Sequence, residues 1–437
     1  MNARALAIQI LGRVRSTDAY LNLVLDAQLA EHDFDDRRDA ALVTELCYGA
    51  TRRQLALDYA ISQFADRRLE RLEDRVLAAL RIGAYQMFYL RIPRRAAVSE
   101  TIEGLKQLRL SRSAGFVNAV LRKLAELEEM PLPVSADPAV ELSIRESHPL
   151  WLVQRWLRQF GIDRTRAMLA ANNQPPALAV RTNSSKISRP ELLLRFEQAH
   201  LAARPTAHSQ QGILLQGEGK PDQLPGYAQG LWQVQDEAAQ LVVEFADFPE
   251  GAKTLDACAA PGGKACHLAE RSLVVATDNR KIKLLKLEAE AKRLGVLERI
   301  ETQVHDATSP FPEAWGPFAG VLVDAPCSGL GTLRRHPELR YRMEENDLRR
   351  LSKLQQRILE NCQAQVAPGG LLVYSVCSID PEEGQDVVEI FLRSHPEFTV
   401  EVSSRADRIP QFQGFLRTLP GPESLDGFFA ARLRRLY

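Results

Sequence analysis

From about Gly251 onward, the sequence alternates short apolar runs with longer amphipathic segments. We expect five of these runs to be buried strands, at 254–257, 273–277, 300–304, 320–323 and 371–376. We expect helices at 263–270, 281–294, 347–366 and 383–394, and a late strand at 426–433. This alternation is typical of a doubly wound parallel sheet. Ligands bind at the carboxyl ends of the strands in such sheets, so the residues that follow the strands are the first candidates for a functional site.

Two of the expected strand ends carry a cysteine. Cys327 lies in Val-Asp-Ala-Pro-Cys-Ser (323–328), and Cys377 lies in Tyr-Ser-Val-Cys-Ser (374–378). A thiolate is a suitable nucleophile for the polarised double bond of a pyrimidine ring, and a second thiol beside it can help to release the product. The alternative is a pair of inert buried thiols, because free cysteine packs as a small hydrophobic residue. The presence of both cysteines, next to the loop described below, favours the chemical role.

A loop rich in small residues follows the first expected strand. Its sequence is Asp-Ala-Cys-Ala-Ala-Pro-Gly-Gly-Lys (256–264). Small residues and paired glycines let backbone approach a ligand closely, and the next helix turns its N-terminal amides toward it. The pattern is neither the dinucleotide fingerprint nor a P-loop. The alternative is a plain connection between strand and helix.

Acidic residues at three further strand ends favour a cofactor site over that alternative. Asp278 comes about 20 residues after the start of the loop, where a carboxylate accepts hydrogen bonds from ribose hydroxyls. Asp306 follows the third strand and suits the exocyclic amine of an adenine, and Asp324 follows the fourth. We therefore expect a nucleoside cofactor at this edge of the sheet.

The chain of 437 residues is too long for one ordinary domain, and its length alone suggests about three. Apolar residues recur at helical spacing in the first part, and Pro131, Pro133 and Pro138 end that pattern. We expect an all-helical domain at 1–130, a small α+β domain at 140–245 and the α/β domain at 246–437. The helical spacing of Tyr85, Phe88 and Tyr89 favours a place in the core over a base-stacking surface.

The formal net charge is zero, which by itself argues against a nucleic-acid partner. Residues 40–123, however, contain 15 Lys or Arg against 8 Asp or Glu. Basic residues gathered in one helical region can form a positive face in a neutral chain. An ordinary solvated surface with ion pairs is the alternative.

The six cysteines include no C-x-x-C pair and no clustered histidines, so we expect neither a metal site nor disulfides. The N-terminus has no uninterrupted apolar stretch, and no segment approaches the ~20 apolar residues of a membrane helix. We therefore expect a cytoplasmic protein without a membrane partner, and a monomer.

Four runs resemble the RNA cytosine-5 methyltransferases that use S-adenosylmethionine: residues 256–264, 324–331 (Asp-Ala-Pro-Cys-Ser-Gly-Leu-Gly), 334–340 (Arg-Arg-His-Pro-Glu-Leu-Arg) and 374–383. The first third is similar to the RNA-binding fold of the NusB antitermination factor, through Leu80–Gln86, Ala97–Glu100 and Gly115–Arg122. The combination resembles the RsmB (Fmu/Sun) subfamily, which methylates 16S ribosomal RNA. It implies a Rossmann-like class I methyltransferase domain, preceded by a small α+β domain and an all-α NusB-like domain. The chain departs from the family at Val376, usually Thr, and at Tyr341, often Trp.

The resemblance implies a role for each motif residue. Cys377 would attack C6 of the cytosine, Asp324 would stabilise the protonated N3 and hold the exocyclic amine, and Cys327 would release the product. Lys264 would lie between the cofactor loop and the base, where its charge can depress a thiol pKa. The residues implied to bind S-adenosylmethionine are Cys258, Ala259, Ala260, Pro261, Gly262, Gly263, Lys264, Asp278, Asp306 and Asp324. Cys258 would act through its backbone.

The implied partner is 16S ribosomal RNA, free or partly assembled, with the target base flipped out of its stack. Arg334, Arg335, His336 and Arg340 would hold phosphates near that base, or else form an ordinary ion-paired helix start. Two other functions remain open: methylation of transfer RNA by the same chemistry, and a non-catalytic RNA-binding assembly factor. The intact cysteines argue against the second.

Overall fold

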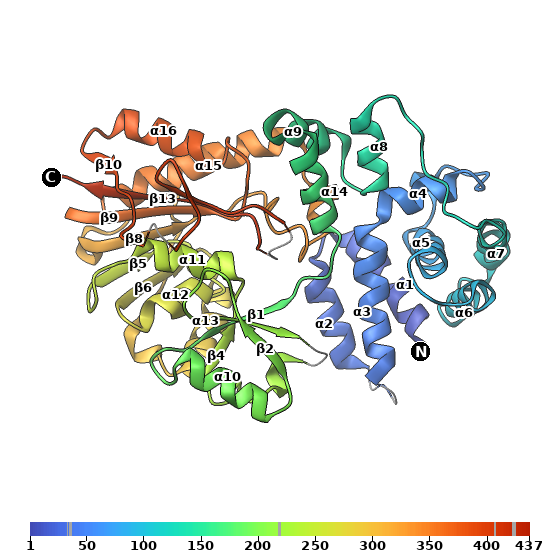
Figure 1. Cartoon of the computed structure of the whole chain (residues 1–437), viewed down its shortest axis with the longest axis horizontal. Coiled ribbons are helices and arrows are strands. Elements are labelled where there is room, and N and C mark those ends of the chain that lie inside the picture. The colour runs from blue at the N-terminus through green and yellow to red at the C-terminus, as the bar shows by residue number, and fades with distance from the viewer. Residues whose placement is uncertain (33, 35–36, 217–219, 406–407, 422–424) are drawn as a thin grey trace. The chain divides into compact units, whose positions relative to one another are not determined.

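The computed structural model describes residues 1–32, 34, 37–216, 220–405, 408–421 and 425–437. The chain forms two compact units (Figure 1). Unit 1 contains Met1–Pro175 and Leu333–Met343, and unit 2 contains Pro176–Thr332 and Glu344–Tyr437. Within the described residues, none of the helices combines the length and the apolar character that crossing a lipid bilayer requires.

Unit 1 is helical, as the apolar spacing predicts. Asn2 caps the first helix by accepting a hydrogen bond of 2.8 Å from the Ala5 amide, and Asp18 ends it in the left-handed conformation. Its long helices are α1 (Ala3–Thr17), α2 (Leu21–Glu31), α3 (Arg37–Arg52), α4 (Gln54–Ser62), α5 (Asp74–Phe88), α6 (Arg94–Gln107), α7 (Ser111–Ala125), α8 (Pro138–Arg145) and α9 (Leu150–Asn172). Within α9, Gly161 has a φ of +73°, so two helical segments meet there.

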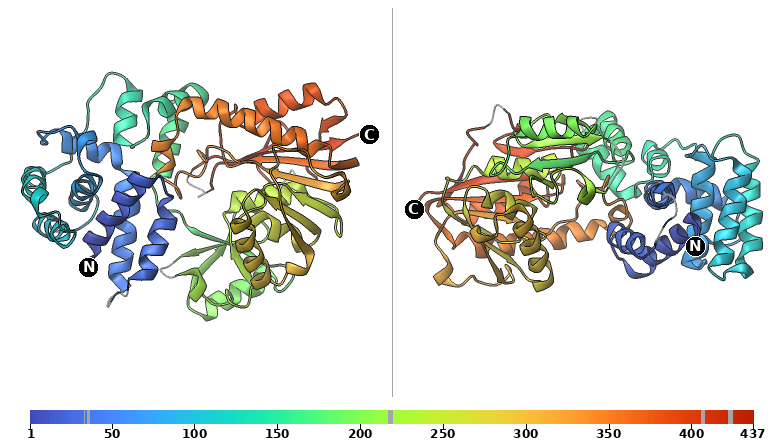
Figure 2. Two further views of the ribbon diagram at one scale, coloured as in Figure 1. Left: turned by 180° about the vertical axis from the view of Figure 1, so that it is seen from behind. Right: turned by 90° about the horizontal axis from the view of Figure 1, so that it is seen from below.

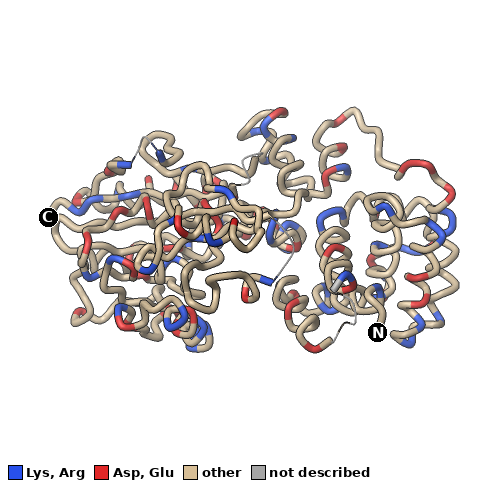
Figure 3. The backbone as a smooth tube through the Cα atoms, turned by 60° about the horizontal axis from the view of Figure 1, so that its bottom comes forward, with Lys and Arg blue, Asp and Glu red and all other residues tan. Residues whose placement is uncertain are grey.

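The core of unit 1 is built from one apolar side of each of several helices. Leu6 and Ile10 of α1 pack with Leu80 and Ala84 of α5, and all four are fully buried. Tyr85 belongs to this core, as expected, and its hydroxyl donates to Glu45. Lys and Arg are interspersed with Asp and Glu along the helices of the unit (Figure 3).

The segment Leu333–Met343 comes from the middle of the α/β sequence but belongs to unit 1. It contains the short helix α14 (Leu339–Arg342). Arg340 is fully buried, and its guanidinium donates to the carbonyl oxygens of Arg52, Ser147 and Asn172. Tyr341 donates from its hydroxyl to the carbonyl oxygen of Ser147 at 2.9 Å. The segment is therefore an integral part of the helical unit.

In the described part of unit 2, the large sheet has nine strands. Its strands β5 (Lys253–Asp256), β6 (Leu273–Asp278), β7 (Ile300–Val304), β8 (Phe318–Asp324) and β9 (Val366–Val376) are parallel, in the order β9-β8-β5-β6-β7. Antiparallel strands extend it beyond β9: β13 (Phe429–Arg435), β12 (Phe415–Arg417) and β11 (Gln411–Phe412), while β10 (Phe398–Val400) pairs with β13. The expected parallel strands and β13 are present, whereas β10, β11 and β12 are additions to the expected sheet.

Helices cover both faces of this sheet (Figures 1 and 2). Residues of α11 (Glu237–Ala246), α12 (Gly263–Ala269) and α13 (Lys281–Leu294) build the core on one face. Residues of α15 (Glu345–Gln363) and α16 (Gln385–Ser394) build the core on the other. The fold is doubly wound, as expected, and its strand order reverses between β5 and β8, which is where ligands bind in such folds.

A smaller antiparallel sheet precedes the large one in unit 2. Its order is β2-β3-β1-β4, from β2 (Ala202–Pro205), β3 (Gly212–Gln216), β1 (Leu178–Thr182) and β4 (Trp232–Val234), and α10 (Arg189–Gln198) packs on it. Arg181 of β1 is fully buried and forms an ion pair with Glu270, the residue that follows α12. This buried pair joins the small sheet to the α/β part of the same unit.

Candidate active site

The residues that follow the parallel strands meet at one edge of the large sheet. Asp324, the last residue of β8, pairs in register with Ser375 of β9. Asp256 ends β5 and Asp278 ends β6. The sheet therefore gathers carboxylates and the two cysteine loops around the reversal point, as the sequence predicts.

Cys327 and Cys377 are in direct contact, with 3.1 Å between their Sγ atoms. Both are partly exposed. The hydrogen bond to Cys377 and burial raise the pKa of Cys327 well above its ordinary value, so Cys327 keeps its proton and can donate it toward Cys377. The geometry places two thiols within hydrogen-bonding distance of each other at the strand-end edge of the sheet.

Lys264 and Ser375 hold Asp324 from two sides. Lys264 Nζ donates to Asp324 Oδ2 at 2.7 Å, and Ser375 Oγ donates to Asp324 Oδ1 at 2.8 Å. Burial by itself would lower the pKa of Lys264, but the attraction of Asp324 and the nearby Cys377 raises it, so the ammonium keeps its charge. The structure thus brings together all four residues that the sequence predicts as catalytic.

Two residues of this arrangement were not among the sequence candidates. Ser375 lies two positions before Cys377, and side chains two apart in a strand share one face, so the period of the strand is the signal that identifies it. The ring of Phe428 lies 5.2 Å from Lys264 Nζ and is buried. Nothing in the local sequence of Phe428 indicates this contact, which depends on the pairing of β13 with β9.

Val376 replaces the usual threonine of the family, and its side chain belongs to the apolar core on one face of the sheet. Ser375, its neighbour in the strand, turns to the opposite face and reaches Asp324. A hydroxyl at position 376 would therefore lie in the core rather than beside Asp324.

The other cysteines of unit 2 are suited to packing rather than reaction. Burial raises the pKa of Cys258 well above its ordinary value, and it raises that of Cys266 to about 12. Cys362 belongs to α15 and is fully buried in the core that this helix covers. Thiols that hold their protons so firmly are poor nucleophiles.

The cofactor loop makes its turn where only glycine fits. Gly262 has a φ of +111°, and a Cβ there would lie 2.8 Å from Leu287 Cγ. Burial and the nearby Asp324 raise the pKa of Asp256, at the start of the loop, to about 7. The loop is thus a compact turn from β5 into α12, with Ala259 buried and Pro261 exposed.

The acidic residues beyond the loop differ in their surroundings. Asp278 is 8% exposed, and its Oδ1 accepts a hydrogen bond of 2.9 Å from the Arg280 amide. Its Oδ2 is 3.5 Å from Nζ of Lys283, a half-exposed side chain that can swing away. Asp306 is exposed, and hydrogen bonds from Thr308 lower its pKa. Oδ2 of Asp278 is therefore a weakly held acceptor, which fits the hydroxyl donors of a nucleoside cofactor. The exposed carboxylate of Asp306 fits an amine donor.

The segment after the Cys327 loop corrects one expectation. Arg340 is fully buried and Arg334 is 4% exposed, with its Nε donating to the Ala171 carbonyl. Burial lowers the pKa of Arg340 to about 10, because its guanidinium is removed from solvent. The prediction that these two arginines hold RNA phosphates is therefore wrong. Arg335 and His336 are partly exposed.

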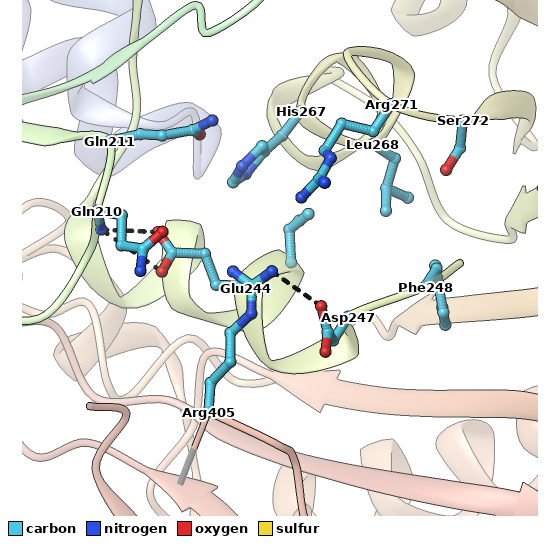
Figure 4. A pocket seen from close by; sticks show the side chains of 11 residues that line it. Gln210, Gln211, Glu244, Asp247, Phe248, His267, Leu268, Arg271, Ser272 and Arg405 are labelled. Carbon is cyan, nitrogen blue, oxygen red and sulfur yellow. Dashed lines mark hydrogen bonds and ion pairs between the residues drawn. The ribbon is translucent and has the colours of Figure 1, made fainter. Parts of the chain in front are cut away.

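Figure 4 shows a pocket elsewhere in unit 2 that contains none of the candidate residues. It has a volume of about 90 Å³ and is lined in part by Glu244, His267 and Arg405. Burial lowers the pKa of His267 well below its ordinary value. Within the pocket, Arg405 forms an ion pair with Asp247 at 2.9 Å.

Comparison with known proteins agrees with this geometry. Residues 245–434 match the family described as "16S rRNA methyltransferase RsmB/F", residues 1–126 match the NusB family, and residues 148–220 match the ferredoxin-like domain of RsmF/B-like methyltransferases. The solved structure of PH0851 shares the fold, with a TM-score of 0.85 and 24% identity over 99% of both chains.

Relatives of the same length share about a third of their residues with this chain. The "Ribosomal RNA small subunit methyltransferase B" of Pseudomonas putida is 35% identical over 100% of this chain and 99% of the relative. The protein of that name from Vibrio cholerae is 35% identical over 100% of this chain and 98% of the relative. Likeness at this level along the whole length, together with the strand-end site, means that the chain belongs to the RsmB/F family of ribosomal RNA methyltransferases, whose cofactor is S-adenosylmethionine.

Proposed function

We propose that this enzyme methylates carbon 5 of one cytosine in 16S ribosomal RNA through a covalent adduct with Cys377. The observation that carries the proposal is the pair of sulfur atoms 3.1 Å apart, beside the carboxylate that Lys264 and Ser375 hold. The names of the full-length relatives support the choice of small-subunit RNA. Because the proposed substrate is ribosomal RNA, we also propose that the enzyme acts in the cytoplasm.

The first step is attack of Cys377 on C6 of the base. A bond forms between Sγ and C6, and the electron pair of the C5–C6 double bond shifts to make C5 nucleophilic. As electron density moves into the ring, N3 takes up a proton, and Asp324 stabilises this shift by accepting hydrogen bonds from N3–H and from the exocyclic amine. Lys264 and Ser375 fix the carboxylate in place, so little reorganisation is needed during the reaction.

When bound, S-adenosylmethionine supplies the methyl group that C5 accepts. Asp278, Asp306 and the loop from Cys258 to Lys264 would hold it. Burial and the nearby Asp324 raise the pKa of Asp256 to about 7. In mildly acidic solution, this residue therefore adds little negative charge at the start of the loop.

The last step is release, for which Cys327 is placed beside the adduct. A base removes the proton from C5, the C6–S bond breaks, and Cys377 leaves as a thiolate. In the free enzyme, Cys377 raises the pKa of Cys327 through their hydrogen bond. Once Cys377 is bound to carbon its sulfur is a weak acceptor without charge, so Cys327 ionises more readily at the stage at which it must accept the C5 proton.

Bisulfite sequencing of 16S ribosomal RNA and transfer RNA tests the proposal. Cells that lack the gene should lose one 16S 5-methylcytosine, which the wild-type gene restores and Cys377→Ala does not. A position lost from transfer RNA instead would support the alternative substrate. No lost 5-methylcytosine in either RNA would contradict the proposal.

A further inference from the structure

A buried carboxylate lies behind the two cysteine loops. Glu383 is fully buried in the turn between β9 and α16. Its Oε1 accepts a hydrogen bond of 2.9 Å from the Ser328 amide and one of 3.0 Å from Gln355 Nε2, and its Oε2 accepts one from the Ser328 hydroxyl. Three donors thus converge on one carboxylate, and two of them come from the residue next to Cys327.

The residue next to Cys377 joins the same network. The hydroxyl oxygens of Ser378 and Ser328 are 3.3 Å apart, and both residues are buried. Because a serine hydroxyl has one proton, Ser328 can donate to only one acceptor at a time, and a carboxylate is the stronger one. A single chain of hydrogen bonds therefore connects the neighbours of both cysteines to Glu383.

Backbone hydrogen bonds join the Cys327 and Cys377 loops before and after Ser328. The Ala325 amide donates to the Ser375 carbonyl at 2.9 Å, and the Gly331 amide donates to the Cys377 carbonyl at 3.0 Å. Between these contacts the chain turns at Gly329, which has a φ of +70°. Side-chain contacts hold this turn against the rest of the unit: Glu383 binds Ser328, and Gln355 Nε2 donates to the Pro326 carbonyl at 3.0 Å.

We propose that Glu383 is a positioning residue that, through Ser328, keeps Cys327 against Cys377 for product release. The inference rests on the proposed function, which gives release to Cys327. Attack and methyl transfer depend on Cys377, Asp324 and Lys264, so a displaced Cys327 slows release more than the earlier steps. A shift of about 1 Å in a reacting group can cost about 100-fold in rate.

The test uses the full-length enzyme, S-adenosylmethionine and a 16S RNA transcript. Glu383→Gln keeps the size of the side chain but replaces one acceptor with a donor, and Ser328→Ala removes the hydroxyl alone. Both variants should accumulate a covalent protein–RNA complex on a denaturing gel, about tenfold above the wild type, while single-turnover methyl transfer changes little. The complex must disappear in the double variant Glu383→Gln, Cys377→Ala.

Two reference variants separate positioning from loss of stability. Cys362→Ala removes a fully buried side chain from α15, the helix that also carries Gln355, and should lower the melting temperature without accumulating the complex. Cys327→Ala should accumulate the complex strongly. If Cys327→Ala traps RNA while Glu383→Gln and Ser328→Ala resemble Cys362→Ala, the positioning role is overturned and the proposed function stands. If Cys327→Ala traps nothing, the release role fails and the inference fails with it.

Discussion

Ser375 Oγ donates a hydrogen bond of 2.8 Å to Asp324 Oδ1, although 51 residues separate the two in the chain. The contact follows from the parallel pairing of β8 and β9, which sets these residues side by side. Asp324 is thereby fixed between a neutral donor and the ammonium of Lys264.

Replacing Ser375 with alanine should slow methyl transfer by about 10- to 100-fold, the effect of losing a hydrogen bond to a charged group. Cofactor affinity should stay within about twofold, because the hydroxyl orients Asp324 and does not approach the ribose site. Single-turnover kinetics and calorimetry with S-adenosylhomocysteine measure the two effects. Equal losses in rate and in cofactor affinity would contradict the role of Ser375.

Cys327→Ala should trap the enzyme on its RNA, because attack and methyl transfer proceed while release is slowed. A slowly migrating band on a denaturing gel is the expected result, and it should be absent when Cys377 is also replaced. Cys362→Ala is the matched control, because that thiol is fully buried in the core away from the site, and it should trap nothing. Full turnover by Cys327→Ala without a trapped band would make Cys327 a structural residue.

Asp256 should make the enzyme less stable as pH rises. Its folded-state pKa of about 7 lies above the ordinary 3.8, so the folded state holds the proton more tightly than the unfolded state does. This contribution is complete below the unfolded pKa and is lost as pH rises through the folded pKa. Its upper limit is about 4 kcal/mol. Calorimetric melting between about pH 5 and pH 8 should show a flatter pH dependence for Asp256→Asn than for the wild type.

An exposed aspartate provides the control for that experiment. Asp66 has a side chain that is 80% exposed, so Asp66→Asn should leave the pH dependence unchanged. If Asp256→Asn and the wild type show the same pH dependence between these limits, Asp256 is not held protonated.

Asp278→Ala should weaken binding of S-adenosylhomocysteine by about 1–3 kcal/mol, the cost of leaving ribose hydroxyls without their acceptor. Lys283→Ala is the matched control, because Lys283 is the half-exposed partner at 3.5 Å that the ribose would displace. That variant should bind at least as tightly as the wild type. Calorimetry decides, and unchanged affinity in Asp278→Ala would exclude the ribose role.

The basic surface of α6 and α7 should supply RNA affinity. Arg95, Arg112 and Arg122 are exposed on these helices, and Arg109 is exposed in the turn between them. Replacing all four with glutamine should weaken binding and make it less sensitive to salt. The slope of log affinity against log salt should fall by about 0.9 per lost phosphate contact if the RNA is paired, and by less if it is single-stranded. Filter binding to a 16S fragment measures both quantities.

Three exposed arginines of α9 outside this region provide the control: Arg158, Arg164 and Arg166. Their replacement should change neither affinity nor slope. From the sequence alone, we would expect an enzyme without residues 1–130 to fold. The structure makes point variants preferable to that deletion. Arg340 and Tyr341 pack on residues near position 52, so such a deletion would expose a buried arginine.

The sequence by itself determined the α/β pattern, the cofactor loop and the placement of Asp278, Asp324, Cys327 and Cys377 at strand ends. These features are local, because strand period, glycine turns and motif spacing can be read within a few residues. The parallel sheet then requires the strand ends to share one edge, so the predicted gathering of site residues also follows from local patterns.

Only the tertiary structure decided which long-range partners each residue meets. Arg340 looks like a phosphate ligand because it stands in a basic run of the sequence. In the structure it is buried and donates to the carbonyl oxygens of residues 52, 147 and 172. Glu383 has no local feature that links it to Ser328, 55 residues earlier. Such contacts arise when separate elements pack to satisfy buried polar groups, and a one-dimensional pattern does not contain that pairing.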